Sequence, residues 1–379
     1  MSTNTRRDFG KAATAAAASF MIVKPQSVRG SQANSAVSLG LIGCGGRGTY
    51  VTGLFAKHEH LRVVGLCDIY DDKLDAATKK WSGAKTYKNY KDVLASNVDA
   101  VYIATPAFLH PEHLEAAIEA RKHIFMEKPA AVDVDGCHRV LRAARKADKT
   151  KRITVDFQQR YGKDYRKARE VVNSGELGAL KMIRAAWLGS GPVVKSGHAE
   201  GEERIRNWFF YRELSGDIVI EQDCHNIDVV NWFAGKTPAR VSGYGSRQIR
   251  QYGNIFDSVA CTFQFDDGRV FSYSANQFKA PGFSDVSETF LCEKGAVNVS
   301  RRGYTIWREK GEPEVAKTAH DITQDAVFEF IDGCREGKLE NAAFHAASST
   351  LTAVMALQAC VTGKEVTWEA SARGEDFSA

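Results

Sequence analysis

Short apolar runs alternate with longer stretches of helical spacing between residues 37 and 157. Each apolar run is bounded by polar or glycine residues, which predicts a buried strand followed by a helix. The expected strands are 37–42, 61–67, 100–104, 123–126 and 152–157, and the expected helices are 50–57, 76–81, 111–120 and 134–147. Regular alternation of strand and helix is typical of an α/β domain with a doubly wound parallel sheet, the Rossmann arrangement.

The pattern changes after residue 157, where long strand-like runs become dominant. The expected strands are 181–188, 239–244, 259–265, 270–276, 288–291 and 304–307, and the expected helices are 165–173, 324–335 and 345–362. Asp266-Asp267-Gly268-Arg269 separates two of these runs and is a hairpin signal. Residues 158–379 are therefore predicted to form an α+β domain with an open, mostly antiparallel sheet, closed by C-terminal helices.

The N-terminus has the features of an export signal. Thr5-Arg6-Arg7-Asp8-Phe9-Gly10-Lys11 is a twin-arginine pattern, and an apolar stretch follows it over residues 12–23. Ser31-Gln32-Ala33 supplies the small residues that a signal peptidase requires. Residues 1–33 are therefore predicted to be a signal peptide that directs the protein to the periplasm or cell envelope. A disordered basic tail on a cytoplasmic enzyme is the alternative.

Composition excludes several classes of protein. The 379 residues are 44% hydrophobic and 26% charged, as in an ordinary globular protein. The net charge is +5, but residues 1–33 hold five basic residues and one acidic residue, which leaves only +1 elsewhere. We therefore expect no nucleic acid partner and no stable insertion of the mature chain into a membrane. The eight cysteines show no CxxC pair or zinc spacing, so no metal is expected.

A glycine-rich turn follows the first expected strand. Gly43-Cys44-Gly45-Gly46-Arg47-Gly48 fits GxGxxG, in which the glycines permit a tight turn and a close approach of backbone to a pyrophosphate. Asp68 lies 20 residues further on, at the end of the second strand, where a carboxylate accepts hydrogen bonds from the adenosine ribose and repels a 2′-phosphate. These residues predict a dinucleotide site that prefers NAD to NADP. Arg47 is either a phosphate contact or a solvated loop cation.

Glu127-Lys128-Pro129 lies 79 residues after the last glycine of this turn. A lysine ammonium beside a nicotinamide can hold a substrate hydroxyl and help to remove its proton as hydride leaves the carbon. A lone Glu-Lys pair is otherwise a surface ion pair. The combination with a dinucleotide site favours a catalytic role for Lys128.

These motifs resemble the glucose–fructose oxidoreductase / inositol dehydrogenase family (Gfo/Idh/MocA). Ala104-Thr105-Pro106, His110 and Lys122-His123-Ile124-Phe125-Met126-Glu127-Lys128-Pro129 carry the resemblance. It implies that Thr105, Pro106 and His110 line the nicotinamide side of the cofactor, and that Glu127 and Lys128 lie against the nicotinamide ribose and the substrate. It also implies a cis peptide bond before Pro129. Ala107 departs from the asparagine usual in the family, so one cofactor contact is missing or replaced.

Residues 215–228 resemble the glycine-led helix of the same family, in which an acid precedes a histidine by four residues. Glu221 and His225 stand at these positions, and a continuous helix would place both side chains on one face. The carboxylate could then orient a histidine that acts as general base. Glutamate replaces the usual aspartate, so Glu221 could instead reach the substrate. A buried core histidine is the alternative for His225.

Further residues are candidates for substrate binding. Aromatic faces beside polar donors suit sugar rings, which have apolar C–H faces and hydroxyl edges. The candidates are Gln158, Arg160, Tyr161, Trp208, Tyr211 and Asp228. A structural role in the core or on a helix face is the alternative for the aromatic residues and for Asp228. The loop that holds Lys195 and His198 is long enough to cover the site.

The sequence thus favours an NAD-dependent oxidoreductase that acts on a secondary hydroxyl of a sugar, cyclitol or derivative and holds its cofactor tightly. One alternative is a glycosidase of the same fold, which would oxidise a ring carbon transiently, eliminate the aglycone, hydrate and re-reduce. Another is a sugar- or NAD-binding protein without turnover. By analogy with the family, a homodimer or homotetramer is expected.

Overall fold

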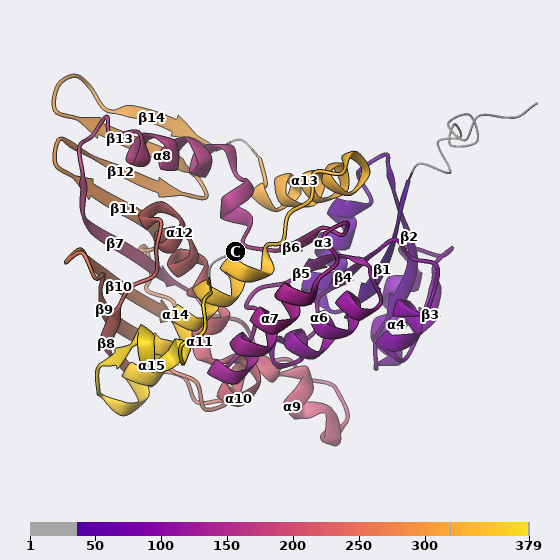
Figure 1. Ribbon diagram of the computed structural model, residues 1–379. Coiled ribbons are helices and arrows are strands. Elements are labelled where there is room, and N and C mark those ends of the chain that lie inside the picture. Colours follow the sequence, from indigo (N-terminus) through magenta and orange to yellow (C-terminus); the bar gives the residue numbers. More distant parts are fainter. Residues whose placement is uncertain (1–35, 319, 378–379) are drawn as a thin grey trace, which may run out of the picture. The chain divides into compact units, whose positions relative to one another are not determined.

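Six parallel strands form the first sheet, in the order β3-β2-β1-β4-β5-β6 (Figure 1). The strands are β1 (Val37–Ile42), β2 (Leu61–Cys67), β3 (Lys85–Tyr87), β4 (Ala100–Ile103), β5 (His123–Met126) and β6 (Ile153–Val155). The helices of this domain are α3 (Gly46–Phe55), α4 (Asp71–Thr78), α5 (Tyr90–Leu94), α6 (His110–Glu119) and α7 (Val134–Lys146). The doubly wound parallel sheet expected from the sequence is confirmed.

The computed structural model describes residues 36–318 and 320–377. The twin-arginine pattern and the apolar stretch after it lie outside the described residues. Within the described ranges one helix, α14 (Ala343–Thr362), is long and apolar enough to cross a membrane by length and composition. Its apolar window is 72% buried inside the protein, and core helices commonly meet the same criteria.

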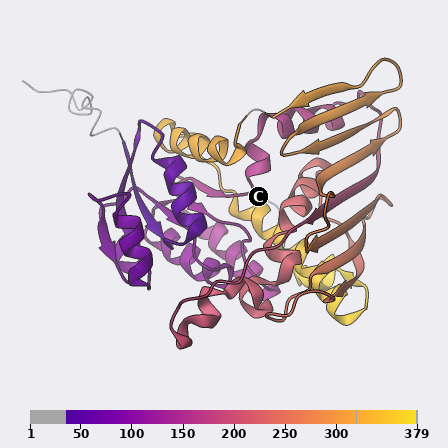
Figure 2. The same cartoon turned by 180° about the vertical axis from the view of Figure 1, so that it is seen from behind.

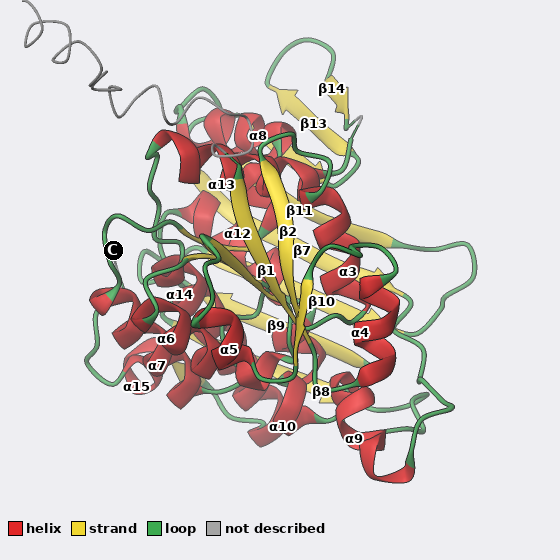
Figure 3. Cartoon of the chain, turned by 90° about the vertical axis from the view of Figure 1, so that its right-hand side faces the viewer, coloured by secondary structure: helices red, strands yellow, loops and turns green. Residues whose placement is uncertain are grey.

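A second sheet of nine strands has the order β14-β13-β12-β11-β7-β10-β9-β8-β15. Only the central pair β7–β10 is parallel, and every other neighbouring pair is antiparallel. Seven of its strands are β7 (Leu180–Gly189), β8 (Arg240–Ser246), β9 (Ser258–Gln264), β10 (Val270–Gln277), β11 (Asp285–Cys292), β12 (Gly295–Ser300) and β13 (Gly303–Arg308). The edge strands are β14 (Glu314–Lys317) and β15 (Val366–Thr367). Figure 3 shows β1 and β2 of the first sheet in front of this second sheet.

The helices of the second domain lie mostly on one face of this sheet (Figures 1 and 2). They are α8 (Lys163–Asn173), α9 (Glu203–Arg206), α10 (Arg212–Ser215), α11 (Asp217–Glu221), α12 (Cys224–Ala234), α13 (Ile322–Glu336), α14 and α15 (Trp368–Ala372). The opposite sheet face exposes Met182, Tyr244, Leu291 and Trp307, which lie on one side of the sheet by strand register. The expected homo-oligomer stays a prediction.

Several elements differ from the expectation. α3 begins at Gly46 and α4 at Asp71, four and five residues before the expected starts, because glycine and aspartate suit first turns although they carry no apolar signal. The sequence pattern missed β3, β12, β14 and β15. Three of these are short edge or near-edge strands with few buried side chains, so they lack the alternation that identifies a strand.

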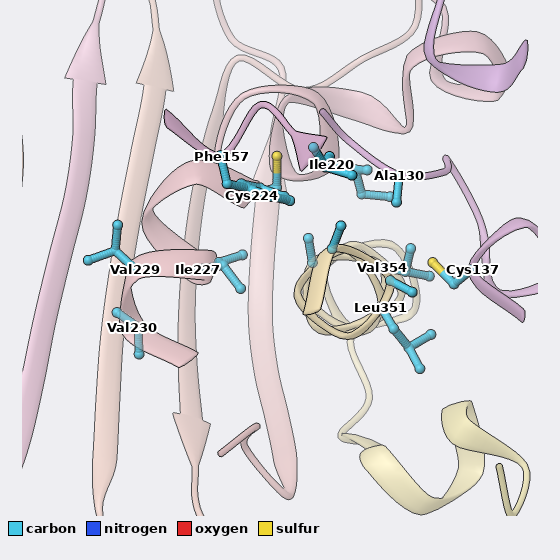
Figure 4. Close-up of a cluster of buried hydrophobic side chains, with 14 of the residues drawn as sticks. Ala130, Cys137, Phe157, Ile220, Cys224, Ile227, Val229, Val230, Leu351 and Val354 are labelled. Atoms are coloured by element: carbon cyan, nitrogen blue, oxygen red, sulfur yellow. The ribbon is translucent and has the colours of Figure 1, made fainter. Parts of the chain in front are cut away.

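Helix α14 packs between the two domains and joins their cores. Figure 4 shows Leu351 and Val354 of this helix among side chains from both domains: Ala130 and Cys137 on one side, Ile227 and Val229 on the other. The helix is buried nearly all round, which explains why its residues are mostly apolar or small and include no acidic residue, lysine or arginine. It therefore fixes the first domain against the second and holds the residues between them in place.

Helix α13 belongs to the second half of the chain but completes the core of the first domain. Its Phe330 ring centroid lies 5.5 Å from that of Phe125 and 6.0 Å from that of Phe55, both in edge-to-face geometry. These three aromatic rings are fully buried. The two domains are therefore interlocked, because each contributes to the hydrophobic core of the other.

Candidate active site between the two domains

The glycine turn after β1 has the geometry of a phosphate cradle. Gly43 has a φ of +99°, and a Cβ there would lie 2.6 Å from the Ala104 carbonyl oxygen. A Cβ on Gly48 would lie 1.9 Å from the Gly43 carbonyl oxygen. Gly45 and Gly46, in contrast, face open space at the N-terminus of α3, where backbone N–H groups favour a pyrophosphate. The residues present therefore fit a dinucleotide.

A pocket of about 430 Å³ extends from this turn along the carboxyl ends of the strands. Asp68 lies in its wall, where the carboxylate accepts hydrogen bonds from the N–H groups of Cys44 (2.8 Å) and Tyr70 (3.0 Å). Burial raises the pKa of Asp68, although these two bonds act in the opposite direction. Five residues predicted as cofactor contacts line the pocket: Gly43, Gly45, Asp68, Thr105 and Pro106.

The pocket also contains residues that the sequence pattern did not identify. They are Tyr70, Lys73, Lys88, Asn89, Tyr90, His113, Ile205 and Arg206. Lys195 of the predicted covering loop and Trp208, predicted as a substrate residue, also line this pocket. His113 donates or accepts a 3.0 Å hydrogen bond with the Thr105 hydroxyl. Its position one turn after His110 was visible in the sequence, but spacing alone does not tell which histidine faces a ligand.

His110 lies beneath the pocket wall and is 1% exposed. Its ring nitrogens lie 2.6 Å from the Pro129 carbonyl oxygen and 2.9 Å from the Thr105 carbonyl oxygen. The histidine thus ties the loop after β4 to the loop after β5. The Lys128–Pro129 peptide bond is cis, as the resemblance implied. Ala107, the position that departs from the family, is fully buried.

The Arg47 side chain turns toward the loops after β5 and β6. Its guanidinium donates to Glu127 (2.9 Å), Gln158 (3.0 Å) and Asp156. The Tyr102 hydroxyl donates to the same Glu127 oxygen over 2.6 Å. Burial, reinforced by the Glu127 charge, raises the pKa of Asp156 to about 7, although Arg47 opposes this shift. Arg47 therefore connects the glycine turn to the loop that carries Lys128.

Lys128 and Glu221 meet across the domain interface. The Lys128 ammonium lies 3.0 Å from Glu221 Oε1 and also donates to the Glu221 backbone carbonyl. Both side chains are mostly buried, with 12% and 16% exposed. Burial opposes the charged form of Lys128, but the Glu221 carboxylate outweighs it and holds the pKa of Lys128 above its usual value. Lys128 therefore carries a positive charge at neutral pH.

Glu221 and His225 do not share a continuous helix. α11 ends at Glu221 and α12 begins at Cys224, so the expectation of one unbroken helix through both is wrong. The break turns the Glu221 carboxylate toward Lys128. Glu221 forms an ion pair with Lys128 of the other domain. A local helical pattern cannot reveal a partner that is distant in the sequence.

His225 is buried against aromatic rings at the start of α12. Its ring stacks on Trp187 with centroids 5.8 Å apart and planes 19° apart, and Phe157 meets it edge-on. His225 Nδ1 is buried without a hydrogen-bond partner among the described residues. Burial, followed by the charges of Lys128, Arg301 and Arg47, holds the pKa of His225 well below its usual value. The imidazole is therefore neutral and can accept a proton.

The other predicted substrate residues lie in several places. Asp228 is fully buried and accepts both branches of Arg160 (2.7 and 2.8 Å) and the Ser349 hydroxyl (2.7 Å). The Tyr161 hydroxyl donates to Glu340, and the Tyr211 hydroxyl to that of Tyr252. Trp208 lines the cofactor pocket, whereas Gln158 bonds to Arg47 near Lys128. In the described residues, no cluster of three metal-ligating side chains occurs.

Glu288 is a buried carboxyl on the inner face of the second sheet, below Trp187. It accepts from the Asn226 amide (2.7 Å), and the Tyr165 hydroxyl lies 3.4 Å away. Burial raises the pKa of Glu288 to about 8, although Arg301 acts in the opposite direction. Most Glu288 carboxyls are therefore protonated at neutral pH.

Replacement of Glu288 by Gln should flatten the pH dependence of stability. The folded state keeps the Glu288 proton up to about pH 8, whereas the unfolded state releases it near 4.5. The stabilisation of the fold by protonated Glu288 is therefore complete below pH 4.5 and is lost as the pH rises to 8. At pH 8 we expect Glu288→Gln to exceed the wild type by on the order of 2 kcal/mol, with little difference at pH 5.

Urea unfolding of both proteins at pH 5, 6.5 and 8 measures this effect. Glu309→Gln, at an exposed position, is the matched control and should follow the wild-type profile. Parallel profiles for Glu288→Gln and the wild type would show that Glu288 titrates normally.

Comparison with known proteins agrees with this architecture. Residues 37–157 match the oxidoreductase family with NAD-binding Rossmann fold, and residues 165–298 match the GFO/IDH/MocA C-terminal domain. The myo-inositol 2-dehydrogenase of Thermotoga maritima is 23% identical over 282 residues, which cover 72% of this chain and 79% of the relative. The uncharacterised oxidoreductase YrbE of Bacillus subtilis is 23% identical over 276 residues, which cover 70% of this chain and 75% of the relative.

Solved structures share the fold at low sequence identity. Levoglucosan dehydrogenase in complex with NADH and levoglucosan superposes with a TM-score of 0.76 at 18% identity, covering 88% of this chain and 99% of that one. The WlbA dehydrogenase of Bordetella pertussis, in complex with NADH and UDP-GlcNAcA, superposes with a TM-score of 0.73 at 23% identity. The match covers 88% of this chain and 98% of that one.

Fold, glycine turn and related proteins together define an NAD-dependent oxidoreductase. The chain belongs to the Gfo/Idh/MocA family, whose two domain types match it in order along the sequence. The resemblance of Thr105-Pro106 and Glu127-Lys128-Pro129 to this family is thereby confirmed at the level of the family.

Proposed function

We propose that this protein oxidises or reduces a secondary hydroxyl of a sugar, cyclitol or related compound. The proposal is carried by two groups at the interface of the two domains: the charged Lys128, and the neutral His225 on whose pKa the Lys128 charge acts. His225 Nδ1 has no hydrogen-bond partner among the described residues. The names of two similar proteins, a myo-inositol 2-dehydrogenase and a levoglucosan dehydrogenase, support a polyhydroxylated substrate. When bound, NAD supplies the acceptor for the hydride.

The two side chains divide the work on the substrate hydroxyl. Lys128 keeps its proton, so its ammonium donates a hydrogen bond to the substrate oxygen and stabilises negative charge that develops there. His225 is neutral and accepts the hydroxyl proton as the C–H bond breaks. Glu221 holds the Lys128 ammonium and maintains its charge. Glu127, bonded to Arg47 and Tyr102, fixes the loop that presents Lys128.

We also propose that the cofactor is held tightly. The segment 190–211, here called the strap, leaves the second domain and reaches the cofactor pocket through Lys195, Ile205, Arg206 and Trp208. Arg206 donates both guanidinium branches to Asp72 of α4 (2.7 and 2.8 Å) and lies 3.9 Å from the Tyr70 ring centroid. Its side chain is only 12% exposed. This contact fastens the strap beside the adenosine end of the pocket.

Export would give this retention a purpose. A twin-arginine substrate folds before it is transported, so an enzyme with a fastened strap could carry NAD with it. Outside the cytoplasm free NAD is scarce, and spent cofactor must then be regenerated in the same site. The strap contact thus favours a redox-neutral cycle, either oxidation of one sugar with reduction of another or the glycosidase sequence of oxidation, elimination, hydration and re-reduction.

Arg206→Ala should accelerate the release of NAD. The substitution removes a bidentate ion pair with Asp72 and a stacking contact with Tyr70. Because Asp72 is half exposed, solvent partly screens the ion pair. We expect the dissociation rate of NAD to rise about 3- to 10-fold. The rate can be followed after dilution of loaded protein into a scavenger of free NAD.

Arg204→Ala is the matched control for this experiment. Arg204 lies on the same short helix, but it pairs with Glu213 and Tyr211 of the second domain. Its removal should leave NAD release unchanged. If Arg206→Ala and the wild type release NAD at equal rates, the contact of the strap with Asp72 does not retain NAD.

The proposed activity is tested on dialysed protein. Protein with its bound NAD is mixed with neutral and acidic sugars, myo-inositol and aryl glycosides, while nicotinamide absorbance and released aglycone are recorded together. Stoichiometric reduction of bound NAD by a sugar or cyclitol supports the oxidoreductase. Aglycone release without net reduction supports the glycosidase. No change in the nicotinamide spectrum with any of these compounds would overturn both.

A further inference from the structure

The inner face of the second sheet carries an arginine that the mechanism above does not use. Arg301 lies in the turn between β12 and β13, and its guanidinium carbon is 5.2 Å from the Trp187 ring centroid. Trp187 is the indole on which His225 stacks. Strand register places Val297, Val299 and Glu288 on the inner face. Arg301 follows the end of β12, and its side chain is half-buried.

Arg301 has no counter-charge at hydrogen-bonding distance. Within residues 36–318 and 320–377, its side chain forms no hydrogen bond or ion pair, and its Nε is buried without a partner. Burial lowers the pKa of Arg301, although Tyr165, Asp156 and Glu288 act in the opposite direction. Arg301 is half-buried, and its guanidinium has no carboxylate partner in the described part of the chain, so it is available to a ligand that carries a negative charge.

The neighbouring acids do not fill this role. Glu288 is largely protonated at neutral pH and is engaged by Asn226. Asp156 has one unpartnered oxygen, Oδ1, but it binds Arg47 through the other and titrates near neutral pH. Lys128 and Arg47 have their own carboxylate partners in Glu221 and Glu127. Arg301, in contrast, has no carboxylate at ion-pair distance among the described residues.

Two further side-chain donors, near the end of β10, also lack an acceptor within the part of the chain that the structure describes. Gln277 donates to Gln222 (2.8 Å) and accepts from Arg250 (2.5 Å) at the end of β10. Gln222 Nε2 and Arg250 Nε are buried without acceptors among the described residues. Donors of this kind need acceptor oxygens, which an oxygen-rich ligand supplies.

We propose that Arg301 binds an acidic group of the substrate, so that the enzyme acts on an anionic sugar such as a uronic acid. This inference rests on the proposed function and specifies its substrate. Because Arg301 and His225 contact one indole, a ligand at the Trp187 edge can present a hydroxyl to His225 and a carboxylate to Arg301. A guanidinium matches a carboxylate in a planar two-bond geometry, which a neutral hydroxymethyl group cannot reproduce.

The test compares matched sugars by binding and by reduction of bound NAD. D-Glucuronate and D-galacturonate are compared with D-glucose and D-galactose, and glucose 6-phosphate tests a different anion. The wild type should bind at least one anion about 10- to 100-fold more tightly than its neutral counterpart, the range expected for a charge-assisted pair. Arg301→Met should abolish this preference, Arg301→Lys should restore part of it, and NAD affinity should not change.

Arg302→Met is the matched control, because Arg302 is the exposed neighbour in the same turn. It should retain the preference for anions. Equal binding of neutral and anionic sugars by the wild type, or an unchanged preference in Arg301→Met, would overturn the inference. Reduction of bound NAD by neutral sugars alone would also overturn it while leaving the proposed function intact. Binding of uronates through Arg301 without any reduction would support the inference but contradict the proposed function.

Discussion

Lys128→Met should lower the turnover rate by about three orders of magnitude or more while NAD remains bound. The substitution keeps a similar side-chain volume but removes the ammonium that we propose to hold the substrate oxygen. Loss of such a group typically reduces rates by about 10²- to 10⁴-fold. Single-turnover reduction of bound NAD with an identified substrate measures the effect without interference from cofactor exchange.

Two further variants separate chemistry from folding. Lys128→Met leaves the Glu221 carboxylate partly buried without its partner, which destabilises the fold. The double variant Lys128→Met/Glu221→Gln removes this charge and should recover stability but not activity. Lys149→Met, at an exposed position, is the control for the substitution itself. Wild-type activity in the stable double variant would exclude Lys128 from the reaction.

His225→Asn should reduce the rate of hydride transfer by about 10²- to 10⁴-fold, the usual range for loss of a general base. Asparagine retains a polar side chain at the start of α12 but cannot accept the substrate proton. Because the pKa of His225 lies well below its usual value, the wild type should keep its rate down to a pH below the ordinary histidine range and then lose it as His225 becomes protonated. The pH profile of single-turnover reduction should lose this acid limb in His225→Asn.

His345→Asn is the matched control, because His345 Nε2 is also buried without a hydrogen-bond partner among the described residues. It lies beside Arg160 and Glu340, among residues separate from those that line the cofactor pocket. This variant should keep both rate and pH profile. A His225→Asn protein that unfolds, or that reacts as fast as the wild type, would instead identify His225 as a core residue.

Local sequence patterns predicted the parts of this protein that depend on local physics. A glycine turn after an apolar strand requires small residues wherever backbone approaches backbone, so Gly43 and Gly48 could be recognised in the sequence. Buried parallel strands are nearly continuous apolar runs, so β1, β2, β4 and β5 were found almost to the residue. Edge strands such as β14 are half exposed, and their pattern is too weak to identify.

The candidate site was predictable only where one short segment contains the signal. Asp68 lies in the pocket wall because it follows a buried strand, and this order is visible in the sequence. Asp228 was also predicted from its local context, as a carboxylate on a helix that could bind substrate. In the structure it forms an ion pair with Arg160, which lies 68 residues away in the sequence. A residue pattern cannot distinguish a carboxylate that awaits a ligand from one that already has an ion-pair partner.

The sequence by itself determined the class of protein: the two domain types, the dinucleotide turn and the loop that carries Lys128. The tertiary structure decided which side chains meet. It paired Glu221 with Lys128, left His225 neutral against Trp187, placed the Arg206 strap on the pocket and left Arg301 without a counter-charge. These outcomes depend on long-range contacts, because burial and neighbouring charges, rather than residue type, set the protonation and availability of a group.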